Sequence, residues 1–362
     1  MNPNATQLAD RLRKAADANR IRADDLLALV RKAFMHCGVA ASDAETAAEI
    51  AVYAQRHGSQ SHGAVHLPLY MTGLLDGTIK NAPKFVTTRP LPCCAVIDAD
   101  HGLGLLASRH AIDIAIDLAK EYGLGAVAVR NSSHFGVAGY YAERAAEQDL
   151  IGLAFTNASR AIAPTGAKEA LLGTNPIGAA FPLPHDDPIV VDMATAVVAR
   201  SRIRHMLTQG HTSIPEGWAL DAEGNPTTDI ATALKGSVQA IGGPKGYALA
   251  LVVELLCSAL SDGEPGFDVT YENVVKRPSG ISQFFLVMNP QGFAGMERYG
   301  ARAQHVADGI KNAKRTETGA PPRLPGARGH AVNRKVSTDG IEMFESLRHA
   351  LKSTAELIEK RG

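Results

Sequence analysis

The sequence has few of the features that mark secreted or nucleic-acid-binding proteins. Only four of its 362 residues are cysteine, and Cys37, Cys93, Cys94 and Cys257 show neither CxxC spacing nor a disulfide framework. We therefore expect reduced thiols in a cytoplasmic protein, without zinc bound through cysteine. The 37 basic and 37 acidic residues cancel, so no net charge attracts nucleic acid or an anionic membrane.

Long apolar segments are also absent. The longest apolar run, residues 247–260, contains Glu254 and is shorter than the roughly 20 residues that cross a bilayer. Residues 1–20 mix acidic and basic side chains and lack the apolar segment of a secretory signal. What is present, 45% hydrophobic and 20% charged residues, is typical of an α/β enzyme rather than a disordered chain.

The common phosphate-binding motifs are missing. No GxxxxGK[ST] occurs, and residues 102–104 and 123–125 each supply only half of a GxGxxG motif. Residues 242–246, Gly-Gly-Pro-Lys-Gly, open an apolar helix whose free N–H groups suit a phosphate, although tight packing explains these glycines equally well. If a dinucleotide binds, the sequence indicates a sheet other than the Rossmann sheet.

Hydrophobic spacing predicts alternating helices and strands. Several predicted strands end in small polar residues, which is where α/β proteins place their ligands. The stretch 220–226 has the composition of a hairpin loop. Helices are predicted at 23–37, 42–54 (with Ser42 as the N-cap), 62–75, 106–122, 139–149, 247–260 and 341–359, and strands at 94–99, 125–130, 151–156, 179–181 and 189–191.

Two histidines are the strongest candidates for chemistry. His62, in Ser61-His62-Gly63, and His134, in the segment 131–136, each lie where a regular pattern gives way to small polar residues. Imidazole is the side chain best suited to moving a proton near neutral pH. A histidine beside glycine can equally be a turn residue or a hydrogen-bonded core residue, so each alone is weak support.

A metal site is an alternative use of the same segment. His57, His62 and His66 form an HxxxxHxxxH pattern, and the pair four residues apart suits one face of a helix in a metal-dependent hydrolase or lyase. Because no acidic residue lies nearby with ligand spacing, we expect no metal.

Six motifs in order resemble the malate/L-lactate dehydrogenase type 2 family, over roughly residues 24–350. This family includes ureidoglycolate dehydrogenase, sulfolactate dehydrogenase, 2,3-diketogulonate reductase and Δ1-piperideine-2-carboxylate reductase. The motifs are Ser61-His62-Gly63 with Leu67, Pro68 and Tyr70; Asn131-Ser132-Ser133-His134-Phe135-Gly136; Gly173-Thr174-Asn175-Pro176; Val191-Asp192-Met193-Ala194; Lys245-Gly246-Tyr247; and Arg323-Leu324-Pro325-Gly326.

The resemblance implies an α/β fold in which a non-Rossmann mixed sheet binds NAD or NADP. A helical substrate-binding and dimerisation domain would be built from both chain ends, residues 20–148 with 310–362. The dinucleotide-binding domain would span 149–309, with 1–19 as an extension, and two copies would form a homodimer. The implied reaction is hydride transfer between nicotinamide and a small carboxylate substrate, with no metal.

The resemblance also implies the roles of individual residues. His62 and His134 would donate or accept the proton, although family members differ in which of the two does so. Substrate contacts would come from Ser61, His66, Tyr70, Thr174 and Asn175. Cofactor contacts would come from Asn157, Ala158, Lys168, Val190, Val191, Asp192, Met193, Ala194, Pro244, Lys245, Gly326, Ala327 and Arg328.

Four positions depart from the family pattern. Gln55 replaces an aspartate, and His66 stands where an arginine is normally found. A protonated histidine there could still bind a carboxylate, or it could mark a different substrate. Ala158 replaces a frequent serine and Ala327 a common glutamate, which leaves the choice of NAD or NADP open. The substrate is a 2-hydroxy acid such as malate or lactate, or alternatively a cyclic imino acid such as pyrroline-2-carboxylate or piperideine-2-carboxylate. A non-catalytic binding protein descended from the enzyme is a third possibility.

Overall fold

The computed structural model describes residues 3–270, 276–317 and 319–361. Within these residues a seven-stranded sheet has the strand order β2-β3-β4-β11-β5-β6-β7. Only β3 and β4 run parallel among its neighbouring strands, and the other pairs are antiparallel. A Rossmann sheet is mostly parallel. The prediction of a mixed, non-Rossmann sheet is therefore confirmed.

The five predicted strands form, and two further strands complete the sheet. The unpredicted β11 lies at its centre, where Phe285 is paired with Val127 on one side and Ala154 on the other. The strands are β2 (Val86–Leu91), β3 (Cys94–Asp98), β4 (Leu124–Ser132), β5 (Ile151–Thr156), β6 (Ile177–Phe181), β7 (Ile189–Met193) and β11 (Ile281–Met288).

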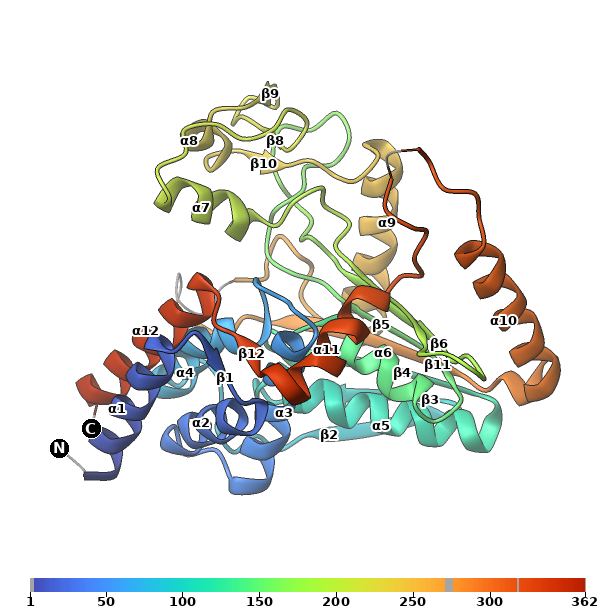
Figure 1. Cartoon of the computed structure of the whole chain (residues 1–362), viewed down its shortest axis with the longest axis horizontal. Helices are drawn as coiled ribbons and strands as arrows, with labels where there is room; N and C mark the ends of the chain where they lie inside the picture. The colour runs from blue at the N-terminus through green and yellow to red at the C-terminus, as the bar shows by residue number, and fades with distance from the viewer. Residues whose placement is uncertain (1–2, 271–275, 318, 362) are drawn as a thin grey trace.

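Helices cover both faces of this sheet (Figure 1). On one face, α5 (Gly104–Tyr122) and α6 (Ala138–Ala146) pack on β4, β5 and β6. On the other lie α9 (Pro244–Glu254) and the π-helical turn η2 (Leu255–Ala259). Because side chains alternate across a strand, Phe285 joins the core beneath α5 while its neighbour Phe284 packs with Val253 under α9.

A helical layer is built from both ends of the chain. Figure 1 shows α1 and α12 side by side, and Arg13 of α1 bonds Glu359 of α12. The members of the layer, with the short ribbon that joins them, are α1 (Pro3–Asp17), β1 (Arg20–Ile21), α2 (Ala23–His36), α3 (Ala41–Arg56), η1 (Gly63–His66), α4 (Leu67–Asp76), β12 (Ile341–Glu342) and α12 (Glu345–Arg361).

Two local predictions in this layer are wrong. The last helix begins at Glu345 rather than at residue 341, because Ile341 pairs with Ile21 in the β1–β12 ribbon. Ser42 is not an N-cap, since α3 already begins at Ala41 and no side chain caps it. Hydrophobic spacing reveals neither a pair of two-residue strands nor the residue at which a helix begins.

A smaller lobe lies above the sheet in Figure 1. Its own core includes Ile203, Ile230 and Val238, and the predicted hairpin at 220–226 joins two of its strands. The lobe contains α7 (Arg200–Thr208), β8 (Ala219–Leu220), β9 (Pro226–Thr227), α8 (Ile230–Ala233) and β10 (Ser237–Val238); η3 (Pro290–Gly292), α10 (Met296–Lys311) and α11 (Ala327–Asp339) follow.

The large sheet can be compared with the predicted boundary between two domains. Its strands come from both sides of residue 148, and β11 hydrogen-bonds to β4 and β5 alike. The boundaries at 20–148 with 310–362 and at 149–309 therefore stay a prediction. Within the described residues, no helix combines the length and apolar character of a bilayer span.

Candidate active site

The loop that carries His62 is fixed by the buried side chain of Gln55. The amide Nε2 of Gln55 donates to the carbonyl of His62 at 2.7 Å, and Oε1 accepts from the N–H of Ala64 at 2.8 Å. Between them, Gly63 has φ +77°, and a Cβ there would lie 2.3 Å from the carbonyl of Ala51. An amide can donate and accept, which a carboxylate cannot. Gln55 therefore holds the His62 loop in a way that the usual aspartate would not.

Three histidine rings stack at this loop. The centroid distances are 5.4 Å for His62 and His66, 5.9 Å for His62 and His134, and 4.8 Å for His66 and His134. His62 precedes η1, His66 ends it, and His134 follows β4. The structure therefore brings both predicted catalytic histidines and the predicted substrate histidine into one group.

Hydrogen bonds orient two of these rings. The hydroxyl of Tyr70 lies 2.8 Å from Nδ1 of His134, which also accepts from the N–H of Gly136 at 3.3 Å. Because that N–H can only donate, the proton of neutral His134 resides on Nε2. Nδ1 of His62 lies 2.8 Å from the hydroxyl of Ser61. Ser61 and Tyr70 thus position the histidines.

Enclosure keeps the three imidazoles neutral. Burial lowers the pKa of His62, and it lowers the pKa of His66 to about 3, with the charge of His62 as a second cause. Burial, then the charges of His66 and His62, hold the pKa of His134 well below its ordinary value. Neutral imidazoles can accept a proton, and a neutral His66 offers hydrogen bonds rather than a positive charge.

A cavity of about 730 Å³ lies against the three histidines. Its wall includes Thr174, Asn157 and Ala158, and the basic residues Arg160, Arg200 and Arg204. No acidic residue is among the described residues that line it. The cavity therefore suits a small anion, and the arginines are residues that the sequence reasoning missed.

Glu254 is a second missed residue, and it organises the wall of this cavity. Its buried carboxylate accepts from Nδ2 of Asn157 at 3.1 Å and from Nδ2 of Asn175 at 3.0 Å. It also accepts from the N–H of Gly266 at 2.8 Å. Asn175 is fully buried and is not among the residues that line the cavity, so its predicted substrate contact stays a prediction. In the sequence, the only sign of its importance is that Glu254 is the single charged residue in the apolar run 247–260.

A second cavity, of about 470 Å³, shares His62, Gly136 and Thr174 with the first. Its wall contains six of the predicted cofactor residues. Asp192 among them accepts a hydrogen bond from the N–H of Gly139 at 3.0 Å. The six are Val190, Asp192, Met193, Ala194, Gly326 and Arg328, while Val191 and Ala327 lie between them in sequence but outside the lining.

The remaining cofactor predictions fall elsewhere. Lys168 and Pro244 line a third cavity of about 450 Å³, beside the hairpin residue Gly224, and Lys245 is exposed next to Pro244. This cavity shares no lining residue with the other two among the described residues. The structure of the single chain therefore groups the predicted cofactor residues into three places rather than one.

Known proteins share this sequence and fold. A sequence model of the malate/L-lactate dehydrogenase family matches residues 21–352. An L-sulfolactate dehydrogenase of Methanocaldococcus jannaschii is 41% identical over 87% of this chain and 90% of its own. Its solved structure superposes with a TM-score of 0.86, over 94% of this chain and 97% of that one, at 38% identity.

Two further relatives differ in their named activities. A (2R)-3-sulfolactate dehydrogenase (NADP(+)) of Chromohalobacter salexigens is 37% identical over 88% of this chain and 92% of its own. A Δ1-pyrroline-2-carboxylate reductase of Burkholderia ambifaria is 31% identical over 90% of this chain and 94% of its own. Similarity at this level therefore includes both hydroxy-acid and imino-acid chemistry.

Proposed function

The chain belongs to the malate/L-lactate dehydrogenase family of oxidoreductases, and from that premise we propose a function for it. It transfers a hydride between the nicotinamide of NAD or NADP and a small 2-hydroxy or 2-oxo acid. One histidine of the pair His62 and His134 gives or takes the accompanying proton. The relatives named as sulfolactate dehydrogenases support this reading.

The observation that carries the proposal is the position of His62. It is the one histidine of the three that lines both adjoining cavities. A hydride acceptor in one cavity and a substrate in the other would meet at this ring. Proximity of this kind is what a two-substrate reaction requires of the protein.

The second cavity fits a dinucleotide in its chemistry. Its wall includes the glycines Gly58, Gly136, Gly139, Gly326 and Gly329 beside residues of the segment 190–194, and glycine lets a ligand approach the backbone closely. Gly326, with φ +87°, closes against Val190 so tightly that a Cβ would lie 3.0 Å from it. Arg328 would add a positive charge for a phosphate. The bound nicotinamide would supply or accept the hydride.

The neutral imidazoles transfer the proton that accompanies the hydride. In the oxidative direction, a neutral ring accepts the proton of a 2-hydroxy group, and in the reductive direction the imidazolium returns it. Ser61 beside His62 and Tyr70 beside His134 hold the rings in one orientation during this exchange.

The substrate carboxylate is held by arginine from α7. Neutral His66 cannot pair with it, whereas Arg200 and Arg204 face the same cavity from the lobe above. A planar guanidinium binds a carboxylate through two parallel hydrogen bonds. In this assignment an arginine binds the carboxylate, but it comes from α7 rather than from position 66.

We also propose that the protein works as a homodimer. The apolar residues of α12 are buried against α1, α2 and α4, so core packing accounts for them. Leu249, Val252 and Leu255 instead leave 43%, 53% and 54% of their surface exposed along α9 and η2. An apolar surface of this kind is typical of an interface. Light scattering on the purified protein would measure the oligomer, and a monomer would reject the proposal.

The function is tested by titrating NADH and NADPH separately, followed by a substrate panel. Micromolar binding of one dinucleotide, with turnover of malate, lactate or sulfolactate, is the expected result. Turnover confined to pyrroline-2-carboxylate or piperideine-2-carboxylate would move the assignment to the imino-acid reductase that the 31% identical relative represents. Folded protein that binds neither dinucleotide would reject both, and would favour a non-catalytic binding protein.

A further inference from the structure

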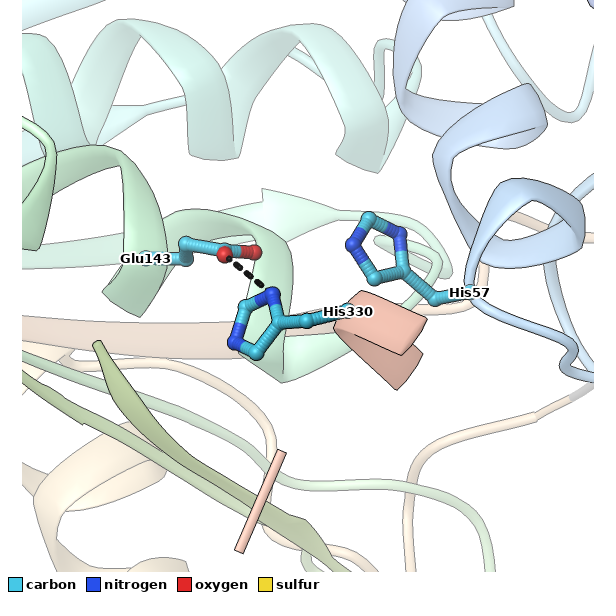
Figure 2. A group of neighbouring side chains, drawn as sticks. All are labelled: His57, Glu143 and His330. Atoms are coloured by element: carbon cyan, nitrogen blue, oxygen red, sulfur yellow. Dashed lines mark ion pairs between the residues drawn. The ribbon is translucent and has the colours of Figure 1, made fainter. Parts of the chain in front are cut away.

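A second polar group lies apart from the three stacked histidines. His57 at the end of α3, Glu143 on α6 and His330 on α11 point toward one another (Figure 2). One ligand atom from each lies within 4.8 Å of the other two. The side chains of His330 and Glu143 are only 7% and 10% exposed. Three elements distant in sequence thus converge on one buried point.

The hydrogen bonds fix which ring nitrogens carry protons. Nδ1 of His57 lies 2.9 Å from the carbonyl of Tyr53, and Nε2 of His330 lies 3.2 Å from the carbonyl of Pro188. A carbonyl only accepts, so both of these nitrogens donate. The lone pairs of the two neutral rings are therefore on Nε2 of His57 and Nδ1 of His330.

The lone pair of His330 faces a carboxylate. Nδ1 of His330 lies 3.4 Å from Oε1 of Glu143, and the other carboxylate oxygen accepts from the hydroxyl of Tyr53. Two acceptors at this distance need a positive charge between them, either a proton or a cation. Burial and the charge of Glu143 raise the pKa of Tyr53, with Asp192 and Glu147 adding to it, so negative charge is concentrated around the group.

We propose that His57, Glu143 and His330 bind one divalent transition-metal ion, Zn²⁺ being the ion that suits two imidazoles and a carboxylate. The metal-binding nitrogens are those left free by the carbonyls of Tyr53 and Pro188, and Oε1 of Glu143 is the third ligand. Metal-binding histidines generally donate their other N–H to a carbonyl or carboxylate, as both do here. Two imidazoles favour zinc, cobalt or nickel over magnesium or calcium.

The geometry requires one adjustment. Ligands at about 2.0–2.1 Å from a tetrahedral ion are roughly 3.4 Å apart. The Glu143 to His330 distance already has this value. His57 must move closer, and it can do so because it follows the last residue of α3 and is only partly buried. His57 and His330 also line the second cavity, which gives an ion access.

This ion would be structural for the cofactor site rather than a participant in the chemistry. Gly326 directly precedes α11 and Arg328 is its second residue, and both line the second cavity. Joining His330 of α11 to α3 and α6 fixes the position of that segment. Metal binding therefore stabilises the fold and tightens dinucleotide binding, and it is independent of which substrate turns over.

The experiment is a titration of the chelator-treated full-length protein with Co²⁺, followed by visible absorption, and with Zn²⁺, followed by thermal unfolding. We expect one Co²⁺ per chain with the absorption of a low-coordinate site, and a rise in Tm with Zn²⁺. His57→Gln and His330→Gln should each weaken Co²⁺ binding at least 100-fold. Tyr53→Phe, which removes only a supporting hydrogen bond, should weaken it roughly 10-fold.

The controls separate this site from others. His305→Gln removes an exposed histidine and should leave the Co²⁺ titration unchanged. Because Glu143→Gln can disturb the fold, the test relies on His57→Gln, which changes a partly exposed residue. No stoichiometric Co²⁺ binding would overturn the proposal and leave His330 and Glu143 as an ion pair. Binding that survives His57→Gln and His330→Gln but is lost in His66→Gln would overturn it too, in favour of the stacked histidines.

Discussion

The ring of His66 lies 4.8 Å from the ring of His134, with an angle of only 8° between their planes. Two imidazolium ions this close would repel each other, and two neutral rings stack. At most one of the two rings can therefore be charged in this arrangement, and burial favours the neutral form of both. Protonation of these rings would therefore disturb both the site and the stability of the fold.

Acid should destabilise the protein through His66. Its pKa is about 3 in the folded chain, against an ordinary value near 6.5. Between these values the unfolded chain binds more protons, so the free energy of unfolding falls as the pH falls below about 6.5. One such group contributes up to about 1.4 kcal/mol per pH unit. Urea unfolding of the wild type and His66→Gln at pH 7 and pH 5 measures this effect.

The variant should lose less stability than the wild type between these pH values. His349→Gln, which removes an exposed histidine, serves as the control and should follow the wild type. An equal slope in His66→Gln and the wild type would show that position 66 is not held neutral by burial.

Removing either catalytic candidate should separate chemistry from binding. His62→Ala or His134→Ala, whichever residue moves the proton, should lower kcat by about 10²–10⁴ while dinucleotide affinity stays nearly constant. The other substitution should act mainly on KM. Steady-state kinetics with dinucleotide titration of both variants decides the assignment. Equal kcat in the wild type and both variants would remove the pair from the mechanism.

Tyr70 should act through His134. Its hydroxyl lies 2.8 Å from Nδ1 and supports the neutral ring, so Tyr70→Phe should raise the pKa that governs the acid limb of kcat/KM. We expect roughly a tenfold loss of kcat together with that shift. A loss of kcat with an unchanged pH profile would indicate a packing role instead.

Two glycines with the same backbone conformation offer a matched comparison. Gly63 and Gly77 both have φ +77°, but a Cβ at Gly63 meets the carbonyl of Ala51 at 2.3 Å, whereas one at Gly77 meets nothing within 4 Å. Gly77→Ala should cost only the left-handed backbone, about 1 kcal/mol. Gly63→Ala adds overpacking and should cost about 3 kcal/mol and most of the activity. Equal costs would mean that the His62 loop relaxes freely.

Hydrophobic spacing predicts the local elements well and long-range pairing poorly. The helix predicted at 106–122 is α5, and the strand predicted at 151–156 is β5 with the same bounds. β11 was missed although residues 284–288 are apolar, and its place between β4 and β5 depends on partners more than 100 residues away. Pairing over such separations is set by the whole sheet, which local spacing does not record.

The candidate site shows the same division. Ser61-His62-Gly63 and the segment around His134 are recognisable in sequence, because their chemistry lies in contiguous residues. Glu143 and His330 are not, since they meet only when α6 and α11 fold against α3. The sequence shows that Gln55 departs from the family pattern. It does not explain what Gln55 does, because its two hydrogen bonds depend on the geometry of the loop.

Glu254 supplies the last prediction. Its carboxylate accepts from Asn157, Asn175 and Gly266, so Glu254→Gln places an NH₂ group against at least one donor whichever way the amide turns. Rotating Asn175 to present its Oδ1 would relieve one clash but abandon its bond to the carbonyl of Ala250. At least one buried hydrogen bond is lost in either case, which costs about 1 kcal/mol in the free energy of unfolding.

The same substitution should also reach the substrate. Asn175 adjoins Thr174, which lines both cavities, so a displaced Asn175 should raise KM more than it lowers kcat. Glu297→Gln, at an exposed position, should change stability by less than about 0.5 kcal/mol. Urea unfolding and kinetics on both variants provide the measurement. Unaltered stability in Glu254→Gln would mean that the three donors find other acceptors, and that the wall of the cavity does not depend on this carboxylate.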